Sequence, residues 1–141
     1  MGESNFDTVV AATAFTGNIT GEISYAPVAR TATTTGATTG TIADAGMLQL
    51  VTVTATAATQ IIILPTPTPG TIVMLKGPAS TGFELRTNAP STVAINGGSG
   101  SNAESAIAAD SVAFLFCSSA TSWDGWEIEA GTTFAAVEAA A

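Results

Sequence analysis

The chain of 141 residues contains few side chains that could do chemistry. It has no histidine, so it lacks the commonest general base and the commonest metal ligand of proteins. Cys117 is the single cysteine, and no histidine is present to activate its thiol. We therefore interpret Cys117 as a buried structural residue, and we predict neither an intramolecular disulfide nor thiol catalysis.

The carboxylates Asp124, Glu127 and Glu129 lie close together near the end of the chain. Such a group could form a glycosidase pair or a calcium site. Glu127 and Glu129 are two residues apart, however, and on a strand they share one face. We interpret that face as the solvated side, with Trp126 inward. The sequence therefore predicts no enzyme activity, no metal site and no cofactor.

Two tryptophans, Trp123 and Trp126, flank the pair Asp124-Gly125, and Asp-Gly is a favoured tight-turn sequence. Exposed aromatic side chains beside a turn can stack on sugars or anchor a protein interface. We interpret Trp126 as closing one end of the core. Trp123 and Asp124 form the candidate exposed binding edge.

Composition limits the partners. Eleven acidic residues stand against three basic ones, Arg30, Lys76 and Arg86, and the net charge is −8. Three scattered cations cannot displace the counterions of a nucleic acid or bind an anionic membrane surface. Charged residues make up only 10% of the chain, against about 25% in ordinary domains, so the surface is neutral and easily buried. No apolar run is long enough to span a membrane, and no basic residue precedes the first apolar stretch as in a signal peptide.

Short apolar and alternating segments predict an all-β chain, which we expect to form a small antiparallel β-sandwich or barrel. Strands are expected at 48–54, 60–64, 71–76, 82–87, 92–95, 111–117 and 126–129. Residues 103–109 favour one helical turn or a strand edge. The segments 60–64 and 111–117 are apolar at nearly every position, as in strands that are covered on both faces. Copies of the chain would then have to cover what a single copy leaves exposed.

The chain divides into three parts. Residues 1–46 are expected to form an extended N-terminal arm followed by a Thr/Gly-rich segment. Within it, 31–46 is either a flexible linker or a strand paired along a neighbouring subunit. Residues 47–130 form the β core, and 131–141 form an Ala-rich tail that is a helical turn or frayed.

The order of these parts resembles a recurrent β module of tailed-bacteriophage virion proteins. The resemblance covers about residues 50–130 and rests on the segments 61–65, 69–76, 83–87, 93–97, 111–116 and 123–126. They resemble the pattern of that module: an apolar strand ending in Leu-Pro, a Gly-led strand, an Ile-x-Gly turn, a Ser-Val-x-Leu strand (Ser111-Val112-Ala113-Phe114 in this chain) and a final Trp strand. Cys117 and the long spacer from Pro65 to Pro69 depart from that pattern, as does the lack of a long N-terminal fibre region.

Such modules occur in tail fibres, head fibres and capsid decoration (cement) proteins, commonly as trimers. The chain begins at its own Met1 and is too short for a whole tail fibre, which favours decoration. The resemblance thus implies a homotrimer on the capsid exterior that binds across major capsid protein subunits, made in the host cytoplasm without a signal peptide. The alternative is a receptor- or glycan-binding module of a head fibre or tail fibre, with Trp123 and Asp124 as its binding edge.

Candidate interface residues follow from this resemblance. The arm residues expected to contact the capsid or another protomer are Phe6, Val9, Val10 and Phe15. Those expected in the core or in trimer contacts are Ile62, Leu64, Phe114, Phe116 and Trp126.

Overall fold

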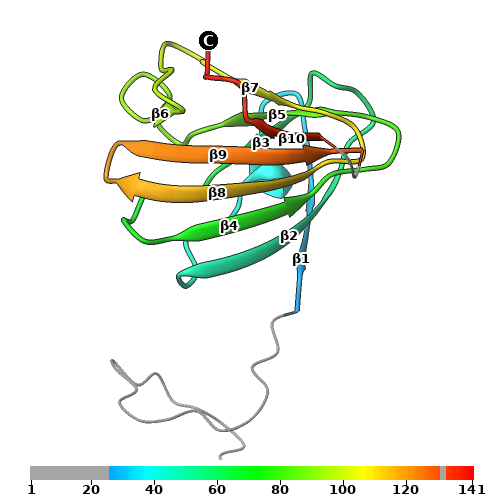
Figure 1. Ribbon diagram of the computed structural model, residues 1–141, viewed down its shortest axis with the longest axis horizontal. Helices are drawn as coiled ribbons and strands as arrows, with labels where there is room; N and C mark the ends of the chain where they lie inside the picture. The colour runs from blue at the N-terminus through cyan, green and yellow to red at the C-terminus, as the bar shows by residue number, and fades with distance from the viewer. Residues whose placement is uncertain (1–25, 131–132) are drawn as a thin grey trace, which may run out of the picture.

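The computed structural model describes residues 26–130 and 133–141, and this part of the chain is all-β, as predicted (Figure 1). It contains no α-helix, only a short 3₁₀ turn, η1 (Thr38–Gly40). The strands are β1 (Val28–Thr31), β2 (Leu48–Thr54), β3 (Ile61–Ile63), β4 (Ile72–Lys76), β5 (Phe83–Arg86), β6 (Ala94–Ile95), β7 (Ser105–Ile107), β8 (Val112–Ser119), β9 (Ser122–Glu129) and β10 (Thr133–Ala136).

The strands form two sheets. The large sheet has the order β1-β2-β4-β8-β9-β10, with β6 also paired to β9. Figure 1 shows β9, β8, β4 and β2 of this sheet side by side. The small sheet has the order β3-β5-β7.

In its first half the chain passes back and forth between the two sheets. It runs from β2 in the large sheet to β3 in the small one, back to β4, and on to β5. Consecutive strands of each sheet are therefore parallel: β1 with β2, β2 with β4, and β3 with β5. Leu48 lies beside Ile72 and Ile61 beside Glu84, so each turn of this coil takes roughly two dozen residues.

The antiparallel arrangement that the sequence predicted is thus present only in part. Alternation of side chains indicates which face a residue occupies, but it carries no information on strand direction. Antiparallel pairing holds for β4 with β8, β8 with β9, β9 with β10, and β5 with β7. Within the described residues, β1 and β10 end the large sheet with one neighbour each, so the sheet does not close into a barrel.

The hydrophobic core lies between the two sheets and forms one cluster. The large sheet contributes Val51, Val53, Val73, Leu75 and Leu115, among others. From the small sheet and its flanks come Ile62, Leu64, Phe83, Leu85 and Ile107. Each such side chain contributes roughly 1.5–3 kcal/mol when fully buried. Ile62 and Leu64, predicted as core or trimer contacts, are core residues.

The folded unit extends beyond 47–130 at both ends. Ala32 and Ile42 are buried in the core, and the N–H of Ile42 donates to the carbonyl of Ile63 at 2.9 Å. The Thr-rich segment therefore pairs within its own chain and is neither a linker nor a strand on a neighbour. The tail forms β10 rather than a helical turn, and Val137 and Ala140 after it are buried.

The Asp124-Gly125 turn was also predicted wrongly, because both residues lie inside β9. The chain turns between β8 and β9 instead, near Ala120 and Thr121. Gly125 serves close approach: a Cβ there would lie 3.2 Å from Val137. The side chain of Asn96 accepts the N–H of Gly125 at 2.8 Å and donates to its carbonyl at 3.0 Å. A glycine within a strand often marks such a contact.

The backbone of the C-terminal segment packs closely against Gly98, and replacement of this glycine tests the fold. A Cβ on Gly98 would overlap the backbone of Ala140, 2.5 Å from its nitrogen. We expect Gly98→Ala to lower the free energy of unfolding by about 2 kcal/mol, because a packed backbone must shift. Gly100→Ala is the control, since its Cβ would make only an ordinary contact with Ala103 at 3.7 Å. Equal unfolding free energies of the two variants in denaturant titrations would contradict this role.

Candidate functional site

The candidate site is the face of the large sheet that points away from the core, which we call the outer face. Side chains alternate across a strand, so the neighbours of the core residues in β2, β4, β8 and β9 project to this side. Four of its apolar side chains are well exposed: Ile72 by 39%, Trp126 by 40%, Phe116 by 42% and Phe134 by 68%. Apolar side chains that are half-buried at outer-face positions are Leu48, Leu50, Met74, Val112, Phe114 and Ile128.

The strand register arranges these side chains in three rows across the sheet. The first row is Leu48, Ile72, Phe116 and Asp124. The second is Leu50, Met74, Phe114, Trp126 and Ala136. The third is Thr52, Lys76, Val112, Ile128 and Phe134. The middle row contains no polar side chain, so the apolar surface is continuous over five strands.

Charge is confined to the first and third rows, which lie toward the ends of the strands. Among the described residues, Lys76 and Asp124 are the charged side chains at outer-face positions of these strands. Lys76 Nζ donates to Asp110 Oδ1 at 2.6 Å, and such an exposed pair contributes little to stability. An apolar centre with a polar rim is the usual anatomy of a protein interface.

The two tryptophans lie on opposite faces of β9, but which of them is buried is the reverse of the prediction. Trp123 is fully buried in the core, so it is not an exposed binding edge; Trp126 is exposed on the outer face and does not close the core. The prediction failed because it placed a turn between them. With β9 continuous, residues three apart must point to opposite sides. Asp124, half-buried, lies on the outer face beside Phe116.

Glu127 is likewise on the core side, only 5% exposed, rather than on a solvated face. Burial raises the pKa of Glu127 above its ordinary value, and the nearby Glu129 carboxylate adds to this. The N–H of Ala108, which donates to Glu127 Oε2 at 3.3 Å, offsets the rise in part. Because Glu127 and Asp124 point to opposite faces of β9, they do not form a carboxylate pair.

The other titratable groups of the described residues do not form a cluster that resembles a reactive centre. Burial raises the pKa of the Cys117 thiol, which fits a structural residue and opposes thiolate chemistry. Burial also raises the pKa of Glu84, with further effects of Glu104 and Glu138, while Arg86 Nη2 donates to Glu104 Oε1. Residues 26–130 and 133–141 contain no group of three or more side chains that could hold a metal ion.

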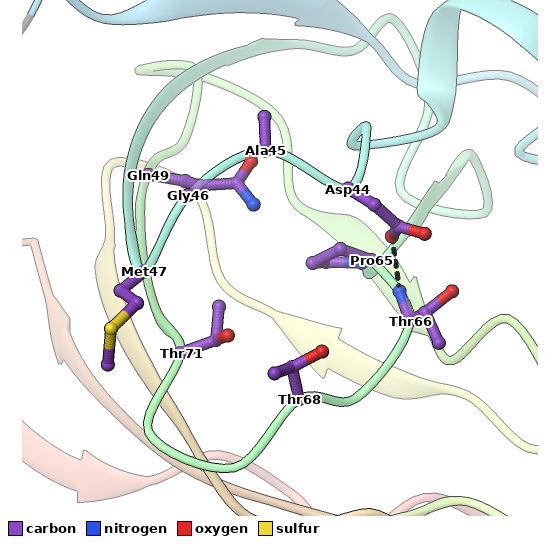
Figure 2. A pocket seen from close by; sticks show the side chains of 9 residues that line it. All are labelled: Asp44, Ala45, Gly46, Met47, Gln49, Pro65, Thr66, Thr68 and Thr71. Carbon is purple, nitrogen blue, oxygen red and sulfur yellow. Dashed lines mark hydrogen bonds between the residues drawn. The ribbon is translucent and has the colours of Figure 1, made fainter. Parts of the chain in front are cut away.

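An open hollow of about 310 Å³ lies between the loop before β2 and the Pro-rich loop before β4. Figure 2 shows the nine residues that line it, including Met47, Gln49 and Thr68. Its single carboxylate, Asp44, accepts the N–H of Thr66 at 2.7 Å through Oδ1. This hollow offers hydrogen bonds to a small polar group, but no pair of titratable side chains that could transfer a proton.

The remaining predicted contacts stay predictions. Phe6, Val9, Val10 and Phe15 lie outside the described residues. Phe114 and Phe116, like Trp126, lie on the outer face, where contact with another copy is sterically open. No helix in the described ranges is long and apolar enough to cross a membrane. The outer-face residues Leu50, Ile72 and Met74 were not singled out from the sequence, although the apolar run of β4 contained the signal.

Comparison of the chain with protein-family models, with curated proteins and with solved structures gives no match in any of the three.

The buried position of Glu127 predicts how stability depends on pH. Since the pKa of Glu127 is raised in the folded state, the folded protein keeps this proton to higher pH than the unfolded chain does. Stability is therefore lost as pH rises from the ordinary glutamate pKa through the raised one. We expect Glu127→Gln to be more stable than the wild type at pH 7, and this advantage to disappear at acidic pH.

Thermal unfolding of both proteins across this pH range measures the effect. Glu129→Gln, in the same strand but more exposed, is the control and should change the pH profile less. A Glu127→Gln variant whose advantage grew on acidification would show that the sign is wrong.

Proposed function

We propose that this chain is a structural protein of a virus particle, namely a decoration protein that binds across major capsid subunits on the outside of the capsid. The observation that carries the proposal is the apolar outer face, which the described residues of β2, β4, β8, β9 and β10 leave uncovered and which assembly with other protein chains would bury. Contiguous apolar surface of this extent marks an interaction site in soluble proteins. The order of sequence motifs resembles that of phage virion modules, and this resemblance is the reason to propose a virus particle.

The negative charge of the chain disfavours nucleic acid and anionic lipid as partners and favours another protein surface. With a net charge of −8, the chain is repelled by nucleic acid and by anionic lipid. Burial of apolar surface is worth about 25 cal/mol per Å², and the many copies on a capsid would add avidity to each weak contact. This suits a protein that stabilises a shell by covering seams between subunits.

The wider proposal includes the partners that the resemblance implies. Copies of the chain associate, with the homotrimer as the expectation from related modules. Phe6, Val9, Val10 and Phe15 contact the capsid or a neighbouring copy. Synthesis takes place in the host cytoplasm.

A fibre module that reads receptors or glycans is less well supported. Its binding edge was expected at Trp123, but the indole of Trp123 is buried in the core. The 310 Å³ hollow near Asp44 lacks an exposed aromatic side chain on which a sugar ring could stack.

Immunogold labelling of intact virions, with an antibody raised against the purified chain, tests the proposed function. We expect gold over the whole surface of the head, at many sites per particle. Labelling at tail tips or single sites would instead indicate a fibre module. Particles without label, from a source that expresses the chain, would contradict a virion role altogether.

A further inference from the structure

We propose that the outer face is covered by the outer face of a second copy, related by a two-fold axis that runs along the strands between β4 and β8. This inference rests on the self-association within the proposed function and names its partner surface. It differs from the resemblance because it assigns two copies instead of three. Since it also buries the outer face between these copies, the contact with capsid subunits falls to other surfaces of the chain.

The middle row is self-complementary under this symmetry. A two-fold axis between β4 and β8 places β8 of one copy over β4 of the other, and β9 over β2. Phe114 then faces Met74 of the second copy, and Trp126 faces its Leu50. Each contact occurs twice. The pair Phe114–Met74 is a thioether–aromatic contact, which is favourable in protein cores.

The shape of the outer face, hollow on one half and raised on the other, fits the same arrangement. A hollow of about 260 Å³ lies over β2 and β4, and its walls include Leu50, Met74 and Val112. The exposed rings of Phe116, Trp126 and Phe134 stand on β8, β9 and β10, on the opposite half of the face. The two-fold axis brings the aromatic half of each copy over the hollow half of the other, with Trp126 above the hollow.

The size of the face is near the lower limit for a specific interface. The axis matches β2, β4, β8 and β9 of each copy, while β10 overlaps β1 in the third row only. With strands about 4.8 Å apart and rows about 6.7 Å apart, the footprint is roughly 450 Å² per copy. Two copies together then bury roughly 900 Å², close to the lower bound expected of a specific interface. Two twisted sheets stack in this way at an angle of about 30°.

The charge distribution favours a second copy as the occupant. An acidic chain repels its own copies unless they meet where the acids are absent. Of the acidic side chains in β2, β4, β8, β9 and β10, only Asp124 projects to the outer face, at the end of its row. A face with so few charges has no opposite charges for a charged partner to pair with, whereas two copies of this face can pack apolar side chains against each other.

The first experiment measures the mass of the full-length chain by light scattering at micromolar concentrations. We expect the wild type at twice its 14.0 kDa. Trp126→Glu and Leu50→Glu should each weaken association at least about 100-fold, because a carboxylate would be buried without a partner. Met47→Glu is the control, since Met47 is exposed but lies in the loop before β2. Circular dichroism confirms that each variant is folded.

A cross-link tests the two-fold geometry directly and does not depend on loss of association. Stacked sheets lie about 10 Å apart, too far for a direct disulfide but within reach of a short bis-maleimide reagent. Within one copy, Leu50 and Trp126 are three strands apart, roughly 14 Å, beyond the reach of such a reagent. The double variant Leu50→Cys with Trp126→Cys should therefore form a covalent dimer when it is treated with the reagent. Each single variant should not, and the native Cys117 is buried.

The outcomes separate this inference from the proposed function. A monomeric wild type, a mass of three copies, or glutamate variants that associate like the wild type would overturn the two-fold pairing. None of these results bears on labelling of virions. Conversely, dimers with the expected cross-link would stand even if the antibody failed to label a particle.

Discussion

This structure depends on one constraint: strands of the large sheet are apolar on both faces, while the described residues cover only one face of that sheet. The inner side chains of β4 and β8, such as Val73 and Leu115, are completely removed from solvent by the small sheet. Their neighbours Ile72 and Phe116 are as apolar, yet no described residue covers them. Exposed apolar surface is disfavoured in proportion to its area, so burial of this face would be favourable.

The coil in the first half of the chain explains why the cover is one-sided. Each passage from β2 to β3 and from β4 to β5 folds the chain onto the same side of the large sheet. The C-terminal segment is likewise held on that side: the side-chain amide of Asn96 donates to the carbonyl of Val137, and the N–H of Ala140 donates to the carbonyl of Ile95. Among the described residues, the connections that build the core thus lie on one side of the large sheet and leave its opposite face without loops.

The sequence predicted the strands better than their arrangement. The segments around Val73, Leu85 and Leu115 alternate or are continuously apolar, and all three form strands as expected. Strand direction could not be predicted, because periodicity is the same in parallel and antiparallel sheets. The Thr-rich segment around Ala32 and Ile42 was misjudged, since small and polar residues conceal the two positions that reach the core. The largest error came from Gly125, because Asp-Gly is usually a turn sequence. Here the glycine is inside a strand, and the absence of a side chain makes room for Val137.

The wrongly predicted turn at Asp124-Gly125 also led to the wrong candidate site. Once Trp123 and Glu127 are known to face the core, the proposed sugar-binding edge and the acidic face both disappear, and Trp126 joins the aromatic side chains of β8. The sequence did contain the more general point: runs such as 111–117 are too apolar for a strand with one solvated side. Which face would be left bare depended on long-range packing that no local pattern records.

Fluorescence quenching of the two tryptophans by acrylamide, as a function of protein concentration, tests most directly whether the outer face is covered in the assembled protein. Trp123 is buried within each copy and should be shielded at every concentration. Trp126 should be shielded at high concentration and become accessible on dilution, as copies separate. A Trp126 that is equally accessible at all concentrations would show that nothing covers this face, and would contradict the account.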